Sequence, residues 1–281
     1  MNNLTNYHSH TSFCDGKAPM EAFIAEAVRQ GFTSYGVSSH APLPFRTRWT
    51  IDDREQTGLY LQEFARLKRL YGDRIELYVG LEIDYLDEDQ QPANDYFQSL
   101  PLDYRIGSVH LLHSTQGEII DIDTKPEVFR EHVRLHLGGD LKRVVLTYFD
   151  KLMRMIGRGG FDFIGHADKI SYNVSCCDPD ILGQRWYKDK ISEYFTFIAE
   201  KGAMIEVNTK TLHRNGFLYP NKEHFGLIRT LGIPVVVNSD AHLPELINSG
   251  RPEALRLLKA SGIGAVWQLE RGVWTEVPIG E

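Results

Sequence analysis

The chain has 281 residues, of which 42% are hydrophobic and 25% are charged. These values are typical of a soluble globular protein and exclude disordered and collagen-like chains. The formal net charge of −7 argues against a general nucleic-acid or anionic-membrane surface, because such binding depends on clustered lysine and arginine. An anionic substrate would therefore need positive charge supplied by its own binding site.

Cysteines and apolar runs indicate the cellular setting. Cys14, Cys176 and Cys177 are too few for a disulfide framework, so we expect a reducing compartment. The sequence contains no uninterrupted run of about 18 apolar residues and does not start with a signal-peptide pattern. We expect a soluble, cytoplasmic protein that has neither a membrane nor a nucleic acid as its partner.

Amphipathic helices and short apolar runs alternate along the chain. A helix is expected over 18–30, ending at Gly31, and another over 184–201, ending at Gly202. The junction of helix, glycine and strand recurs at Gly31, Gly160, Gly202, Gly232 and Gly262. Seven runs are expected strands ahead of a C-terminal one at 263–269: 4–10, 34–40, 75–82, 104–112, 161–166, 203–208 and 233–240.

This alternation predicts an α/β protein with βαβ units around a parallel sheet. Seven or eight such units that close on themselves form a TIM-like barrel, and an open doubly wound sheet is the alternative. No linker rich in proline, glycine or serine divides the chain. We therefore expect a single domain over residues 1–281.

Side chains of the metal-binding type follow the expected strands. They are His8, His10, His40, Glu82, His110, His166, Glu206, Asp240 and His242. The carboxyl ends of parallel barrel strands converge at one rim, so residues distant in sequence become neighbours there. The pairs His8 with His10 and Asp240 with His242 have the spacing that places two side chains on one side of an extended chain.

Asp15, in the first expected loop, adds a further carboxylate. Imidazole suits zinc, iron and manganese, and a carboxylate can bridge two ions. Taken singly, a histidine at a strand end is more often a hydrogen-bonded structural residue. Together, Asp15 and the strand-end residues other than Glu206 could hold two or three ions. Burying so many ionisable groups without a cation would cost several kcal/mol each unless they changed protonation.

The motifs HSHTSFCDG, SSHAP, GLEIDY, GSVH, FIGHAD, EVNT and NSDAH occur in this order over roughly residues 7–242. Together they resemble the polymerase and histidinol phosphatase (PHP) superfamily, and the contexts RIGSVHLL and FDFIGHADKI resemble its histidinol-phosphate phosphatase branch. The resemblance implies a distorted (β/α)7 barrel with three divalent ions (Zn, Fe or Mn). It also implies a phosphomonoesterase that hydrolyses L-histidinol phosphate to L-histidinol and phosphate in histidine biosynthesis.

The resemblance also implies how the ligands are divided. One ion would be held by His8, His10, Glu82 and Asp240, a second by Glu82, His110 and His166, and a third by Asp15, His40 and His242. Metal ions can generate a nucleophile at neutral pH from bound water. We expect a hydroxide bridging the first two ions to attack phosphorus, and Asp240 to accept the proton of the water that forms it. His242 and Asp15 are candidates for the general acid if they are not fully committed to metal.

Contacts to the substrate are expected from other residues after or near the strands. Arginine and lysine bind phosphate well, and Arg158, Lys210 and Arg214 are candidates for this contact. Glu206 or Asn208 could bind an imidazole, although Glu206 could instead support the metal ligands. The expected partner is a small phosphate monoester, and the sequence leaves the oligomeric state open.

Two alternative functions keep the same residues. One is a nuclease or nucleotide phosphoesterase of the same superfamily, and the other is a barrel that has lost catalysis. His132 and His136 have the spacing of a helical metal pair, but no acidic catalytic residue accompanies them, so we assign them to a solvated helix face.

Overall fold

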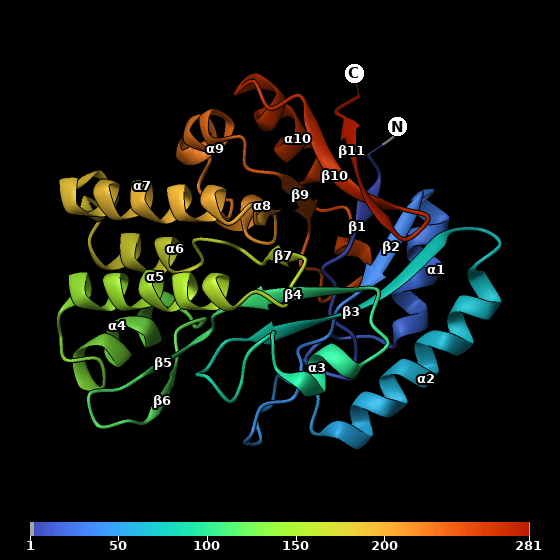
Figure 1. The fold of residues 1–281 in the computed structure, drawn as a ribbon, viewed down its shortest axis with the longest axis horizontal. Coiled ribbons are helices and arrows are strands. Elements are labelled where there is room, and N and C mark those ends of the chain that lie inside the picture. The colour runs from blue at the N-terminus through green and yellow to red at the C-terminus, as the bar shows by residue number, and fades with distance from the viewer. Residues whose placement is uncertain (1–2, 281) are drawn as a thin grey trace.

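A computed structural model describes residues 3–280, and seven parallel strands form its centre (Figure 1). They lie side by side in the order β1 (Thr5–Asn6), β2 (Ser34–Val37), β3 (Glu76–Asp84), β4 (Tyr104–Ser108), β7 (Phe163–Ile164), β8 (Met204–Asn208) and β9 (Val235–Asn238). Beyond the ends of β1 and β9, Ala241 exchanges backbone hydrogen bonds with His8 and His10. The sheet thus nearly closes, which confirms the distorted (β/α)7 TIM-like barrel.

The helices cover the outside of the barrel. They are α1 (Met20–Gln30), α2 (Arg54–Tyr71), α3 (Asp95–Ser99), α4 (Pro126–Leu135), α5 (Leu141–Arg158), α6 (Ile170–Cys177), α7 (Arg185–Glu200), α8 (Leu212–Asn215), α9 (Phe225–Leu231) and α10 (Arg251–Ala260). In Figure 1, α1 and α2 lie on one side of the strands and α4 to α7 on the other. Over residues 3–280, no helix is both long and apolar enough to cross a membrane.

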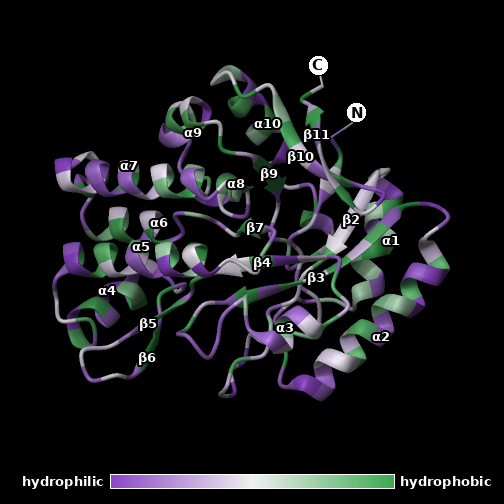
Figure 2. Cartoon of the chain, in the orientation of Figure 1, coloured by the Kyte–Doolittle hydropathy of each residue, from purple (hydrophilic) through white to green (hydrophobic). Residues whose placement is uncertain are grey.

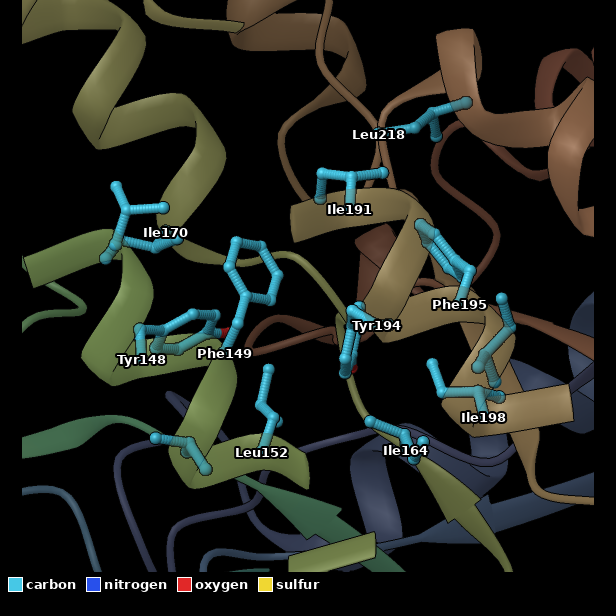
Figure 3. Packing of buried hydrophobic residues seen from close by; sticks show 14 of the residues in the cluster. Tyr148, Phe149, Leu152, Ile164, Ile170, Ile191, Tyr194, Phe195, Ile198 and Leu218 are labelled. Carbon is cyan, nitrogen blue, oxygen red and sulfur yellow. The ribbon is translucent and has the colours of Figure 1, made fainter. Parts of the chain in front are cut away.

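Apolar helix faces pack onto the strands and onto one another. Hydrophobic and hydrophilic residues alternate along α1, α2, α5 and α7 in Figure 2, as expected for amphipathic helices. Between α5 and α7, the buried rings of Phe149 and Tyr194 lie 5.0 Å apart (Figure 3). Gly31 ends α1 in the left-handed conformation, so the helix end expected from the sequence is confirmed.

The C-terminal run expected as a strand does not join the barrel. It forms β10 (Ala265–Glu270), which pairs antiparallel with β11 (Val273–Pro278). Arg271 and Gly272 connect the two strands with φ values of 51° and 77°, as in the two-residue turns that suit a β-hairpin. The antiparallel pairing with β11 takes the place of a parallel pairing with β9, although α10 provides a crossover between β9 and β10.

The run 104–112, expected as one strand, also divides. Its first part is β4, and its last residues begin β5 (Leu111–His113), which pairs antiparallel with β6 (Ile119–Asp121). The chain leaves the barrel between them, at Val109 and His110. This hairpin stands beside the rim of the barrel.

The end of the barrel opposite the rim is filled by aromatic side chains. The β10–β11 hairpin covers this end, where Leu269 donates its N–H to the Tyr7 hydroxyl, and Trp274 packs edge-on against Tyr7. Tyr104 crosses the interior and donates its hydroxyl to the Tyr7 carbonyl. Glycine is needed beside this ring, because a Cβ on Gly80 would lie 2.4 Å from Tyr104 Cε2.

We expect Gly80→Ala to destabilise the protein by about 1–3 kcal/mol or more, because overpacking a filled interior forces side chains from their rotamers. Gly58 is the control: it lies within α2 and a Cβ there meets no atom within 4 Å. Gly58→Ala should stabilise by about 0.5–1 kcal/mol. Urea unfolding of both variants measures this, and equal effects would contradict the packing proposed for Tyr104.

Candidate metal centre

The structure brings all nine expected ligand residues to the rim formed by the carboxyl ends of the strands. Four overlapping groups contain side-chain ligand atoms within 4.8 Å of one another: His10, Asp15, His40 and His242; His8, His10 and Glu82; His8, His166 and Asp240; and His40, Glu82 and His110. All except Asp15 and Glu82 lie just past the end of a barrel strand, and Glu82 lies within β3. We call these nine residues the rim cluster.

Glu82 lies at the centre of the rim cluster, with five imidazoles around one buried carboxylate. Its Oε2 is 3.1 Å from His8 Nε2, 3.4 Å from His10 Nε2 and 3.0 Å from His40 Nδ1. Its Oε1 is 2.8 Å from His166 Nε2 and 3.4 Å from His110 Nε2. The two oxygens thus face different groups of histidines, which is the geometry of a bridging carboxylate.

The other two carboxylates of the cluster, Asp240 and Asp15, also lie beside histidines. Asp240 Oδ1 lies 3.2 Å from His10 Nε2 and 3.9 Å from His8 Nε2. Asp15 Oδ2 lies 3.2 Å from His242 Nε2 on the outer side of the cluster. Zinc ligands at 2.0–2.2 Å in tetrahedral positions are about 3.4 Å apart, so these separations fit shared cations.

Several nitrogen and oxygen atoms of the cluster that could bind a metal ion are buried and form no hydrogen bond within residues 3–280. They are His8 Nε2, His10 Nε2, Asp15 Oδ1, His40 Nδ1 and Glu82 Oε2. Burying a polar atom without a hydrogen-bond partner costs free energy, and these five unpartnered atoms all belong to the same cluster. Burial raises the pKa of Glu82, but the charges of His8, His40 and His110 lower it more, to well below its usual value. Glu82 is therefore ionised, as a metal ligand must be.

A second layer of carboxylates orients the histidines. His8 Nδ1 lies 2.7 Å from Glu206 Oε1, and His110 Nδ1 lies 3.0 Å from Asp84 Oδ2. A carboxylate on the second nitrogen fixes the ring and its tautomer, which is the usual environment of a metal-binding histidine. Asp84 is not among the site residues expected from the sequence. The available signal was its position two residues after Glu82, which places both side chains on one face of β3.

Glu206 and Asn208 lie inside the barrel and not in the expected position beside a substrate. Both are fully buried. The Glu206 carboxylate accepts hydrogen bonds from the His166 N–H and from the Asn208 and Asn238 amides, besides its contact with His8. Asn208 also donates to Asp240. These contacts use both side chains to hold members of the rim cluster.

The backbone is strained at two members of the cluster. His166 has a φ of 29° and Asp240 a φ of 49°, and within residues 3–280 only one other non-glycine residue has a positive φ. Such conformations cost of order 1–3 kcal/mol each and occur where the surroundings enforce them, often at functional sites. Here Glu206 holds the backbone of His166, and Asn208 holds the side chain of Asp240.

A cavity of about 860 Å³ opens over the rim cluster. Of the nine cluster residues, Asp15, Asp240 and His242 line it, and these are the three that the sequence suggested for catalysis. Its cationic lining residues are Lys17, Lys125, Lys169, Lys210 and Arg214. We call this space the rim cavity.

Two of the three expected phosphate contacts are at the rim cavity. Lys210 Nζ lies 3.1 Å from Asp240 Oδ1, and Arg214 lies in α8 on the cavity wall. Arg158 is not brought there: it ends α5, is more than half exposed, and pairs with Glu88. A helix that precedes a barrel strand runs antiparallel to it, so its last residue lies toward the opposite end of the barrel. We therefore leave Arg158 out of the site.

The fold and the rim cluster define a metal-binding α/β barrel. Residues 6–210 match the model of the PHP domain, and the chain belongs to this family. It is 26% identical over 251 residues to the histidinol-phosphatase of Bacillus subtilis, covering 84% of this chain and 92% of that protein.

Two solved structures share the fold. A crystal structure from Listeria monocytogenes, named as a candidate histidinol phosphatase, has a TM-score of 0.77 at 21% identity, covering 89% of this chain and 99% of that one. The histidinol phosphate phosphatase of Lactococcus lactis, in complex with zinc, L-histidinol and phosphate, has a TM-score of 0.70 at 16% identity, covering 97% and 99% of the two chains.

We expect Glu206→Gln to weaken metal binding by about 10–100-fold, because partners of metal-binding histidines typically contribute this much. The glutamine amide would place a donor against groups that donate to Glu206. Competition with a chelator measures the affinity, and Glu55→Gln, on the exposed surface of α2, is the matched control. Unchanged affinity in Glu206→Gln would contradict the supporting role of Glu206.

Proposed function

We propose that this chain is a metal-dependent phosphomonoesterase that hydrolyses L-histidinol phosphate to L-histidinol and phosphate. The observation that carries the proposal is the rim cluster, in which nine imidazole and carboxylate ligands meet beneath a cavity with cationic walls. Membership of the PHP family and the similarity to named histidinol-phosphatases support the choice of substrate.

We further propose that the cluster holds three divalent ions of zinc, iron or manganese. His8, His10, Glu82 and Asp240 would hold one, Glu82, His110 and His166 a second, and Asp15, His40 and His242 a third. The contacts of Glu82 with both His8 and His166 support its place between two ions. When bound, such ions lower the pKa of coordinated water toward 7 and offset the charge of the phosphoryl group.

The chain's own residues would orient the ester and move protons. Lys210 and Arg214 bind the phosphate oxygens, since both line the rim cavity and carry a positive charge. Asp240 accepts the proton of the attacking water, because it lines the rim cavity and is ionised: the pKa of Asp240 is held well below its usual value. Burial raises that pKa, but Lys210 and His8 lower it more.

The leaving alkoxide also needs a proton. Asp15 and His242 lie 3.2 Å apart on the cavity wall, and His242 Nδ1 lies 3.0 Å from the Asp240 carbonyl oxygen. This second contact sets the direction of the imidazole ring. Either side chain of this pair would supply that proton only where it is not fully committed to the third ion.

Metal removal tests the cofactor. We expect dialysis against a chelator to abolish phosphate release and to lower Tm by roughly 5–10 °C, because a ligand present at 100 times its Kd stabilises the folded chain by about 2.7 kcal/mol. Elemental analysis and thermal unfolding measure the two effects. A chain that keeps its activity without bound metal would contradict the proposal.

The proton acceptor is tested by Asp240→Asn, which we expect to lower kcat by about 10²–10⁴-fold, the usual contribution of a general base. Metal content is measured in parallel, because Asp240 is also an expected ligand. Asp73→Asn, on the exposed surface after α2, is the control and should retain full activity. A variant with full metal content and full kcat would remove Asp240 from the mechanism.

The substrate is tested by phosphate release from histidinol phosphate against sugar phosphates and dinucleotides. We expect the highest kcat/KM for histidinol phosphate. Faster cleavage of dinucleotides would favour the nuclease alternative, and no release with zinc, manganese or iron supplied would favour a barrel without catalysis.

A further inference from the structure

Outside the rim cluster, the charged residues that line the rim cavity are mostly cationic, and Asp123 carries the opposite charge. The cationic side chains are Lys17, Lys125, Lys169, Lys210 and Arg214. Among the described residues that line the cavity, Asp123 is the one carboxylate outside the rim cluster. A cavity that bound only a phosphate group would gain nothing from this carboxylate on its wall, because the two negative charges repel.

Asp123 is held in place by its surroundings. Asn173, on α6, uses its side-chain amide to donate hydrogen bonds to the carbonyls of Ile122 and Thr124, at 3.1 and 3.0 Å. These two residues flank Asp123 in the chain. The N–H of Asp123 donates to Asp121 Oδ1 at 2.8 Å. The backbone of Asp123 is thus fixed on both sides, which pre-organises its carboxylate.

The position of Asp123 is also fixed relative to the rim cluster. The N–H of Ile122 donates to the carbonyl of His110 at 2.9 Å, so the residue before Asp123 is bonded to a cluster member. Asp123 Oδ2 lies 3.0 Å from Nζ of Lys169, which is buried. About a third of the Asp123 side chain remains exposed, and this part faces the rim cavity.

We propose that Asp123 binds an ammonium group of the substrate beside its phosphate, so that the rim cavity selects phosphate monoesters of amino alcohols. This inference rests on the proposed function and deepens it. In an ester of a 2-amino alcohol, two carbon atoms separate the ester oxygen from the amine. The recognition site for the amine must therefore adjoin the phosphate site, and Asp123 lines the same cavity as Lys210 and Arg214.

The ionisation state of Asp123 suits this role. Burial raises its pKa, but the charges of Lys169 and Lys210 lower it more, to below its usual range. Asp123 is therefore a carboxylate at neutral pH, when the amine is protonated. An ammonium ion and a carboxylate form a charge-assisted hydrogen bond, which is stronger than a neutral one.

The test compares matched esters with and without the amine. One pair is L-histidinol phosphate and 3-(imidazol-4-yl)propyl phosphate, and the other is phosphoethanolamine and ethyl phosphate. We expect the metal-loaded enzyme to prefer the amine in each pair that it hydrolyses. Asp123→Asn should lower kcat/KM for the amine-bearing ester by about 10–100-fold, mainly through KM, the usual value of a hydrogen bond to a charged group.

The same substitution should leave kcat/KM for the ester without the amine within about threefold, because that ester makes no charged hydrogen bond to Asp123. Glu127→Gln, an exposed acidic residue at the start of α4, is the matched control and should change neither ester. The metal content of Asp123→Asn should equal that of the parent enzyme, and its Tm should fall, because the buried Lys169 loses its charged partner.

Three results would overturn the assignment. Equal losses on both members of a pair would mean that Asp123 only balances the charge of Lys169. No loss on either, or a parent enzyme without preference for the amine, would also exclude it. If histidinol phosphate is not hydrolysed but Asp123→Asn removes a preference for phosphoethanolamine, the proposed substrate fails and the role of Asp123 stands.

Discussion

Five histidines surround the carboxylate of Glu82 where the parallel strands end, and this concentration of buried ionisable groups is the constraint on the rest of the structure. Groups of this kind are costly to bury unless each has a partner. Glu206 and Asp84 provide part of that compensation through the second nitrogens of His8 and His110. The donor atoms that remain point toward one another, so cations complete the arrangement.

The two ends of the barrel differ: one is filled by packed aromatic side chains, and the other holds the rim cluster. At the end covered by the β10–β11 hairpin, Tyr7, Tyr104 and Trp274 fill the interior, and glycine is required where the rings approach the backbone. At the opposite end, the strained backbone at His166 and Asp240 is tolerated because buried partners hold it. Hydrophobic packing therefore holds the end covered by the hairpin, and polar contacts set the geometry of the rim.

Charge is also divided. The chain carries a net charge of −7, yet the wall of the rim cavity carries lysines and an arginine. The cationic wall can attract an anionic ester although the whole molecule is acidic. Solvent ions largely screen exposed charges that lie farther away than about 8–10 Å. Asp123 introduces the opposite charge at one fixed point of this wall.

The sequence by itself determined the alternation of helices and strands and the nine residues of the rim cluster, because periodicity, glycine stops and residues at strand ends are local signals. That alternation left a closed barrel or an open sheet, and the motifs that resemble the PHP family indicated the barrel. Only the tertiary structure decided what surrounds them. It placed the C-terminal run in a hairpin outside the barrel, buried Glu206 behind His8, kept Arg158 away from the cavity, and fixed Asp123 through Asn173. These outcomes depend on contacts between residues far apart in the chain, whose geometry no local pattern encodes.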